Sequence, residues 1–103
     1  MRKPNARNLG RPLTDVEWSD EAVHSVEAIH DHIALDKPLA AVAFAATILR
    51  AGDSLKTFPQ RGRPAAGQWR ELTSVRPYVI RYLYDPTRDH VMVVSVTHGA
   101  RLP

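Results

Sequence analysis

Residues 68–101, QWRELTSVRPYVIRYLYDPTRDHVMVVSVTHGAR, decide the fold of this chain. They are rich in Val, Ile, Tyr, Leu, Thr and Trp, the residue types that suit a pleated, half-buried surface. Breaks at 76–77 and 85–89 divide the segment into three runs. Because a parallel crossover needs a dozen or more residues, breaks this short predict antiparallel neighbours. We therefore expect a three-stranded antiparallel meander, with strands at about 68–75, 78–84 and 90–98.

Two helices are expected before the meander. Ser19 is a typical N-cap residue, and Asp20 and Glu21 follow in the first turn, where the helix dipole favours negative charge. An apolar repeat of helical period then continues to about position 34. Asp36 is expected to cap a second, alanine-rich helix, in which Pro38 is tolerated in the first turn; this helix is predicted to reach about position 57.

The first strand follows from alternation, and the arrangement of the helices follows from the length of the link between them. Alternation in residues 13–18 predicts a short strand, with Val16 and Trp18 on one face, and Trp18 is placed to pack on Val23 as a hydrophobic staple. The link between the helices is only two or three residues long, so they must form an antiparallel hairpin. Helices of this length need tertiary packing, which places the hairpin on the sheet. The predicted order is β-α-α-β-β-β, an α+β domain over residues 14–103.

Composition limits the class of protein. With 103 residues, 44% hydrophobic and 24% charged, the chain suits one soluble domain with one core. The absence of cysteine excludes disulfides and thiolate metal sites, and it agrees with a reducing cytoplasm. The sequence contains no uninterrupted run of about 18 apolar residues, so no membrane span is predicted. The N-terminus lacks the apolar segment of a secretory signal. We expect a cytoplasmic protein without a membrane partner.

Charge is divided along the sequence. Residues 1–13 carry four basic groups and no acid, and we interpret them as a flexible basic arm. Residues 14–36 carry seven acids and no Lys or Arg, whereas residues 37–103 carry ten basic and four acidic groups. This division favours an acidic or nucleic-acid partner for the C-terminal part, with an evenly solvated surface as the plain alternative.

Five short motifs carry a resemblance to a known family. They are WSDEA at 18–22, FP at 58–59 with GRP at 62–64, REL at 70–72, PYVIRY at 77–82 and VTHGAR at 96–101. In this order and spacing the chain resembles the RelE/ParE superfamily of bacterial toxins from type II toxin–antitoxin pairs. The resemblance covers about residues 15–101.

This resemblance implies two activities. RelE-like members are ribosome-dependent mRNA endonucleases, and ParE-like members poison DNA gyrase. In both branches a cognate antitoxin wraps its C-terminal segment around the toxin, and the pair binds operator DNA only through the antitoxin. Neither activity leads us to expect a cofactor. The histidines His24, His30 and His32 lack a third ligand that could be placed beside them, so no metal site is expected.

The nuclease motif is incomplete. Metal-free RNA cleavage through the 2′-OH needs a base, cations at the phosphate and an acid. Matching the family motif puts Tyr78 where RelE-like members carry a catalytic Arg; the terminal Arg is matched by Arg101, and the Tyr or His after it has no match. Lys56 is the last lysine. These departures favour the ParE-like branch, a protein-binding inhibitor of gyrase rather than an enzyme.

Two alternatives stay open at this point. An altered nuclease could use Arg81, His98 and Arg101, or the chain could be a non-toxic relic that only binds an antitoxin. In the favoured reading, the basic residues and one tyrosine contact the antitoxin or the target. These residues are Lys56, Arg61, Arg63, Arg70, Arg76, Tyr78, Arg81 and Arg101.

Several strand residues admit a structural reading beside the functional one. Arg81 is either held by a carboxylate, with Asp15 or Glu17 as the expected partner, or belongs to a functional surface. Glu71 is expected to form an ion pair with Arg70, with a catalytic base as the alternative. Tyr78, Tyr82 and Tyr84 alternate on one face of the strand expected at 78–84, where they serve either as core packing or as a contact platform. His98 is either a packing residue or an acid–base group.

Overall fold

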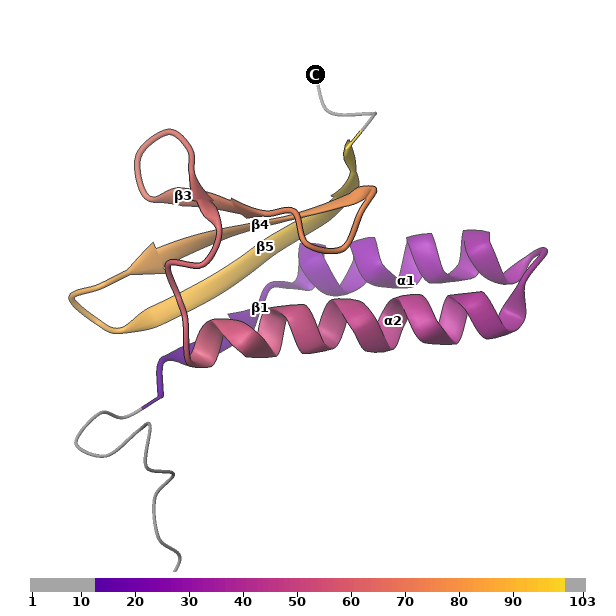
Figure 1. Ribbon diagram of the computed structural model, residues 1–103, viewed down its shortest axis with the longest axis horizontal. Coiled ribbons are helices and arrows are strands. Elements are labelled where there is room, and N and C mark those ends of the chain that lie inside the picture. Colours follow the sequence, from indigo (N-terminus) through magenta and orange to yellow (C-terminus); the bar gives the residue numbers. More distant parts are fainter. Residues whose placement is uncertain (1–12, 100–103) are drawn as a thin grey trace, which may run out of the picture.

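The computed structural model describes residues 13–99. Nearly all of the expected basic arm, and Arg101, lie outside the described residues. The elements follow the predicted order, with a short additional strand and a 3₁₀ turn (Figure 1). They are β1 (Asp15–Trp18), α1 (Asp20–Ala34), α2 (Pro38–Asp53), η2 (Ser54–Lys56), β2 (Arg63–Pro64), β3 (Trp69–Leu72), β4 (Tyr78–Asp85) and β5 (His90–His98).

The predicted meander is confirmed inside a larger, mixed sheet. Its strand order is β1-β5-β4-β3-β2, in which β3, β4 and β5 pair antiparallel and β1 lies parallel to β5. The two-residue strand β2 pairs antiparallel with β3, in a segment for which the sequence predicted no strand. A strand this short has no periodic pattern, and only its pairing with Glu71 and Arg70 defines it.

The helical hairpin lies on one face of this sheet (Figure 1). The core forms between them from Phe44 and Ile48 of α2, Ile80 and Tyr82 of β4, and valines of β5. Position 80 and its even-numbered neighbours therefore point towards the helices, which settles a choice of face that the sequence left open. Among residues 13–99, no helix covers the opposite face, which we call the outer face.

A register shift adjusts the sheet in its middle. Ile80 pairs with Val96, but Tyr82 pairs with Val93, so β5 contains one residue more than β4 between these two pairs. The extra residue keeps both valines in the core although they are three positions apart.

The helix ends agree with the sequence in one case and differ in the other. Ser19 caps α1, and its Oγ accepts a hydrogen bond from the Ala22 N–H at 3.0 Å. The expected cap at Asp36 is wrong: the N-cap of α2 is Lys37, which makes no side-chain capping bond. Pro38 occupies the first helical position, where the backbone N–H that proline lacks would have no partner within the helix.

The segment Pro38–Lys56 is long and apolar enough, by length and composition alone, to cross a membrane. In this fold its apolar residues instead build the core, through Ala41, Phe44, Ile48 and Leu55. The face of α2 that points away from the core exposes Leu39 and Leu49.

Candidate functional site

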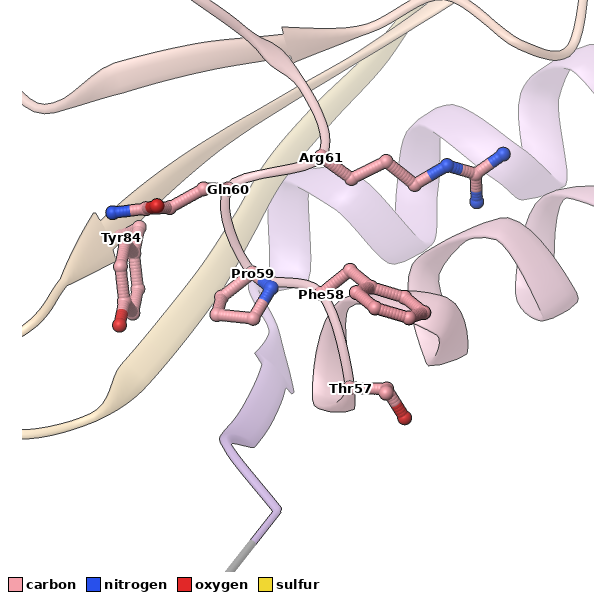
Figure 2. A pocket seen from close by; sticks show the side chains of 6 residues that line it. All are labelled: Thr57, Phe58, Pro59, Gln60, Arg61 and Tyr84. Carbon is pink, nitrogen blue, oxygen red and sulfur yellow. The ribbon is translucent and has the colours of Figure 1, made fainter. Parts of the chain in front are cut away.

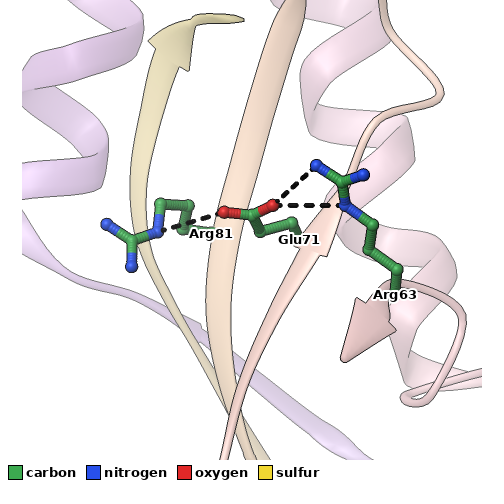
Figure 3. Close-up of polar contacts among 3 residues, drawn as sticks. All are labelled: Arg63, Glu71 and Arg81. Carbon is green, nitrogen blue, oxygen red and sulfur yellow. Dashed lines mark hydrogen bonds and ion pairs between the residues drawn. The ribbon is translucent and has the colours of Figure 1, made fainter. Parts of the chain in front are cut away.

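Three charged side chains from three strands meet on the outer face of the sheet (Figure 3). Arg63 donates to Glu71 Oε1 through Nε at 3.2 Å and Nη2 at 3.0 Å. Arg81 Nε lies 3.8 Å from Oε2 of the same carboxylate. Glu71 therefore lies between two guanidinium groups, and its side chain keeps 19% of its surface exposed.

Two expected ion pairs are wrong in their partners. Arg81 pairs with Glu71 because β3 and β4 place the two residues opposite each other. The expected partners Asp15 and Glu17 belong to β1, on the far side of β5, where both lie near His90. The expected pairing of Glu71 with Arg70 fails because neighbouring strand residues point to opposite faces.

The Arg81 guanidinium also lies over the ring of Trp69, 4.7 Å from its centroid. Its Nε is buried and makes no hydrogen bond, while the side chain as a whole is 38% exposed. The cation–π contact and the carboxylate hold the charge in place at the sheet surface. Arg81 is thus held by Glu71 and Trp69 and still presents an accessible positive charge.

Arg70 points the other way and holds the loop after η2. Its Nη1 donates to the carbonyls of Gln60 at 3.1 Å and Gly62 at 2.7 Å. Beside it, the Tyr82 hydroxyl donates to Pro59 O and accepts from the Gly62 N–H, each at 2.8 Å. Arg70, predicted as a contact residue, is therefore committed to its own chain.

Tyr78 and His98 face the helices. They are paired across β4 and β5, and their rings meet edge to face at 5.6 Å between centroids. The Tyr78 ring also packs at 4.8 Å from Phe44 of α2. The two residues border a hollow of about 280 Å³ with Ala28, Ile29 and His32 of α1.

Arg81 and His98 consequently lie on opposite faces of the sheet. Arg81 is three positions after Tyr78 in an unbroken strand alternation, so it points away from the side that Tyr78 and His98 share. The altered nuclease set predicted from Arg81, His98 and Arg101 is not brought together by the described residues, and Arg101 lies outside them.

A larger hollow opens where α2 ends (Figure 2). It measures about 610 Å³ and is lined by Thr57, Phe58, Pro59, Gln60, Arg61 and Tyr84. Phe58 is 62% exposed, which is unusual for an aromatic side chain of this size. We call this space the Phe58 hollow.

A second, smaller hollow shares Arg61 with the first. It measures about 280 Å³ and is lined by Thr47, Arg50, Ala51, Arg61, Ser74 and Val75. We call it the Arg50–Arg61 groove. Sequence reasoning named Arg61 but missed Arg50 and Phe58. The signal for Arg50 was a charge at the end of an apolar helix, while Phe58 was named only as part of the FP motif at 58–59.

Among residues 13–99, no group of three or more His, Cys, Asp or Glu side chains is placed to hold a metal ion. His30 and His90 each pair with a carboxylate, at Asp31 and Glu17 respectively.

Comparisons with known proteins agree with this fold. Residues 16–103 match a family model described as the ParE toxin of type II toxin–antitoxin system, parDE. The curated protein "Toxin RelE2" of Caulobacter vibrioides is 41% identical over 90 residues, which are 87% of this chain and 100% of that protein. A solved structure titled "Chromosomal ParDE TA system from P. aeruginosa" aligns with a TM-score of 0.73 and 20% identity, over 84% of this chain and 96% of that chain. At this identity, the structural likeness concerns the fold alone.

Proposed function

Because this chain belongs to the ParE toxin family of type II toxin–antitoxin systems, we propose that it acts by binding and poisoning DNA gyrase. The membership in the RelE/ParE superfamily predicted from the sequence is confirmed. As the toxin of such a pair, the chain has a cognate antitoxin as its partner. The proposal concerns the target and the way in which the toxin acts on it.

The observation that carries the proposal is the separation of Arg81 from His98 by the sheet. Cleavage through a 2′-OH requires an acid, a base and cations around a single phosphate, each within hydrogen-bonding reach. Arg81 lies with Glu71 and Trp69 on the outer face, whereas His98 lies with Tyr78 beside α1. One phosphate cannot contact both side chains, which favours a protein-binding toxin.

Binding a protein target uses accessible charge, and the exposure of the predicted residues supports some of them more than others. Arg70 and Tyr78 are occupied inside the molecule. Arg61, Arg63 and Arg76 are exposed, and Arg81 is half-exposed. We propose these four as the basic contacts to gyrase or to the antitoxin, with Arg101 as a further predicted contact outside the described residues.

One observation favours the second candidate, a RelE-like mRNA endonuclease. The curated relative that carries the name Toxin RelE2 is 41% identical over its whole length. In that case Arg101 would complete a site with either Arg81 or His98, since the two faces of the sheet exclude both together.

The test compares gyrase supercoiling with cleavage of mRNA on programmed ribosomes, using one preparation of the toxin. We expect inhibition of supercoiling, intact mRNA, and loss of inhibition after preincubation with the antitoxin. His98→Gln should inhibit gyrase as well as the wild type does. Cleaved mRNA with normal supercoiling would refute the proposal, and loss of that cleavage in His98→Gln would place the chain among RelE-like toxins. A protein that arrests no growth and affects neither assay would be a non-toxic relic.

A further inference from the structure

The Arg50–Arg61 groove carries two positive charges that no carboxylate within residues 13–99 neutralises. Neither guanidinium forms an ion pair within residues 13–99, whereas Lys56 and Arg63 do. Lys56 pairs with Asp53 at 2.8 Å, and Arg63 pairs with Glu71 at 3.0 Å. Arg50 and Arg61 therefore bring two exposed positive charges into one groove.

Hydroxyl groups hold the two arginines in position. Arg61 Nη1 donates to Ser54 Oγ at 2.6 Å, and Ser54 Oγ donates onward to the Ala51 carbonyl at 2.6 Å. Arg50 Nη2 donates to Thr47 Oγ1 at 3.3 Å. A guanidinium has five N–H donors, so each arginine keeps most of its donors for a ligand. Fixing them beforehand reduces the entropy that binding would cost.

The surroundings select an anion. The end of α2 contributes roughly half a negative charge through its free carbonyls, which two guanidiniums outweigh. Ser74 adds a hydroxyl to the lining, while Ala51 and Val75 are apolar. A carboxylate fits such a groove well, because its two oxygens match the planar fork of an arginine.

The adjoining Phe58 hollow adds an apolar contact. Phe58, Pro59 and Tyr84 line it (Figure 2). Arg61 lines both spaces. A ligand that fills both spaces needs an acidic group and an apolar group a few residues apart. An extended peptide segment has this chemistry.

We propose that the Arg50–Arg61 groove binds an acidic side chain of the antitoxin, while a neighbouring apolar side chain of the same segment enters the Phe58 hollow. This inference rests on the proposed function in so far as the partner is an antitoxin. Nucleic acid is the less suitable ligand, because phosphate backbones bind along tracks of many cations, and here Lys56 and Arg63 are already paired.

The experiment measures binding of the full toxin chain by calorimetry. The probes are the antitoxin encoded next to the toxin gene, a synthetic peptide of its C-terminal segment, and the same peptide with every Asp and Glu changed to Asn and Gln. The variants are Arg50→Gln and Arg61→Gln. The control is Lys37→Gln, which removes one positive charge from the exposed, opposite end of the same helix.

We expect each groove variant to bind the acidic peptide about 10-fold more weakly or worse, because a charge-assisted hydrogen bond is lost. The Lys37 control should stay within about twofold, since surface charges this far away are screened. The peptide in which Asn and Gln replace every Asp and Glu should bind wild type and variants with equal, weak affinity. Arg61→Lys, which keeps the charge but loses the planar fork, should give an intermediate value.

Two failures are distinguishable. If wild type binds neither the antitoxin nor the peptide, the groove inference fails with its partner, and the gyrase assay alone decides the proposed function. If wild type binds tightly but the groove variants match the Lys37 control, the groove inference is overturned and the proposed function stands. Binding of a 20-nucleotide RNA that is lost in the groove variants, with peptide binding unchanged, would also overturn it. Thermal unfolding by circular dichroism shows whether each variant is folded.

Discussion

Tyr82 joins the loop after η2 to the sheet, together with Arg70. It is fully buried, and its hydroxyl bonds to Pro59 O and to the Gly62 N–H. Burial raises the pKa of Tyr82 above the ordinary value of 10.0, an effect that the Gly62 N–H and the charges of Arg70 and Arg61 partly oppose. The phenol therefore stays neutral wherever the protein is folded at ordinary pH.

Tyr82→Phe should destabilise the fold, because it leaves a buried carbonyl and a buried N–H without partners. We expect a loss of about 1–3 kcal/mol in the free energy of unfolding near pH 7, measured by urea denaturation. The substitution should also shift Arg61 and Phe58, because the Tyr82 hydroxyl anchors the loop that carries them.

The pH dependence of the same variant is a sharper check. The unfolded chain releases the Tyr82 proton near pH 10, but the folded protein keeps it to higher pH. The stabilisation that Tyr82 contributes to the wild-type fold is therefore fully present below about pH 10. It is lost as the pH rises through the pKa of Tyr82 in the folded protein. Tyr82→Phe should lack this part of the alkaline loss. Equal alkaline losses in both proteins would contradict the assignment.

At the scale of elements, α2 approaches β1 very closely at one place. Gly52 is buried in the last turn of α2, and a Cβ added there would overlap the six-membered ring of Trp18. Trp18 packs on the core at the end of β1. The absence of a side chain at position 52 therefore sets the distance between helix and strand.

Gly52→Ala tests this contact. On helix propensity alone the change would stabilise α2 by up to about 1 kcal/mol. We expect a net destabilisation of about 1–3 kcal/mol instead, because the core is overpacked. Adding Trp18→Phe should recover part of the loss relative to the Trp18→Phe single variant, as a double-mutant cycle would show. A stabilised Gly52→Ala would mean that the ring moves away at little cost.

The whole molecule has one covered and one uncovered sheet face. The hairpin buries Ala22, Phe44 and Ile48 against the sheet, so neither helix has a core of its own (Figure 1). The outer face and the end of α2 are left with the accessible charges, on Arg81 and on Arg50 and Arg61. Both proposals draw on these accessible charges, and Arg61 is common to the two.

An isolated peptide of residues 20–56 should therefore be largely unfolded in water. Helices of this length are marginal alone, and the hairpin buries its apolar face only on the sheet. Circular dichroism should show weak helicity without a cooperative melting transition. A cooperative melt at the helicity of the full chain would show that the hairpin folds independently of the sheet.

The sequence by itself determined the elements and their order. The cap at Ser19, the meander and the hairpin were all predicted because propensity, capping and short links act within a few residues. The same reasoning failed at Asp36, where an acid before a proline suggested a cap that the backbone placed one residue later. It also missed β2, which has too few residues for a pattern.

Only the tertiary structure decided which side chains meet. Glu71 pairs with Arg63 and Arg81 through strand register, and no local signal encodes the register. Arg81 and His98 were grouped in the sequence as an alternative nuclease site, but pairing and alternation place them on opposite faces. Arg50 and Arg61 share a groove because α2 and the loops around it converge there. Such contacts join residues whose spacing in the chain carries no information about their distance, so they follow from packing alone.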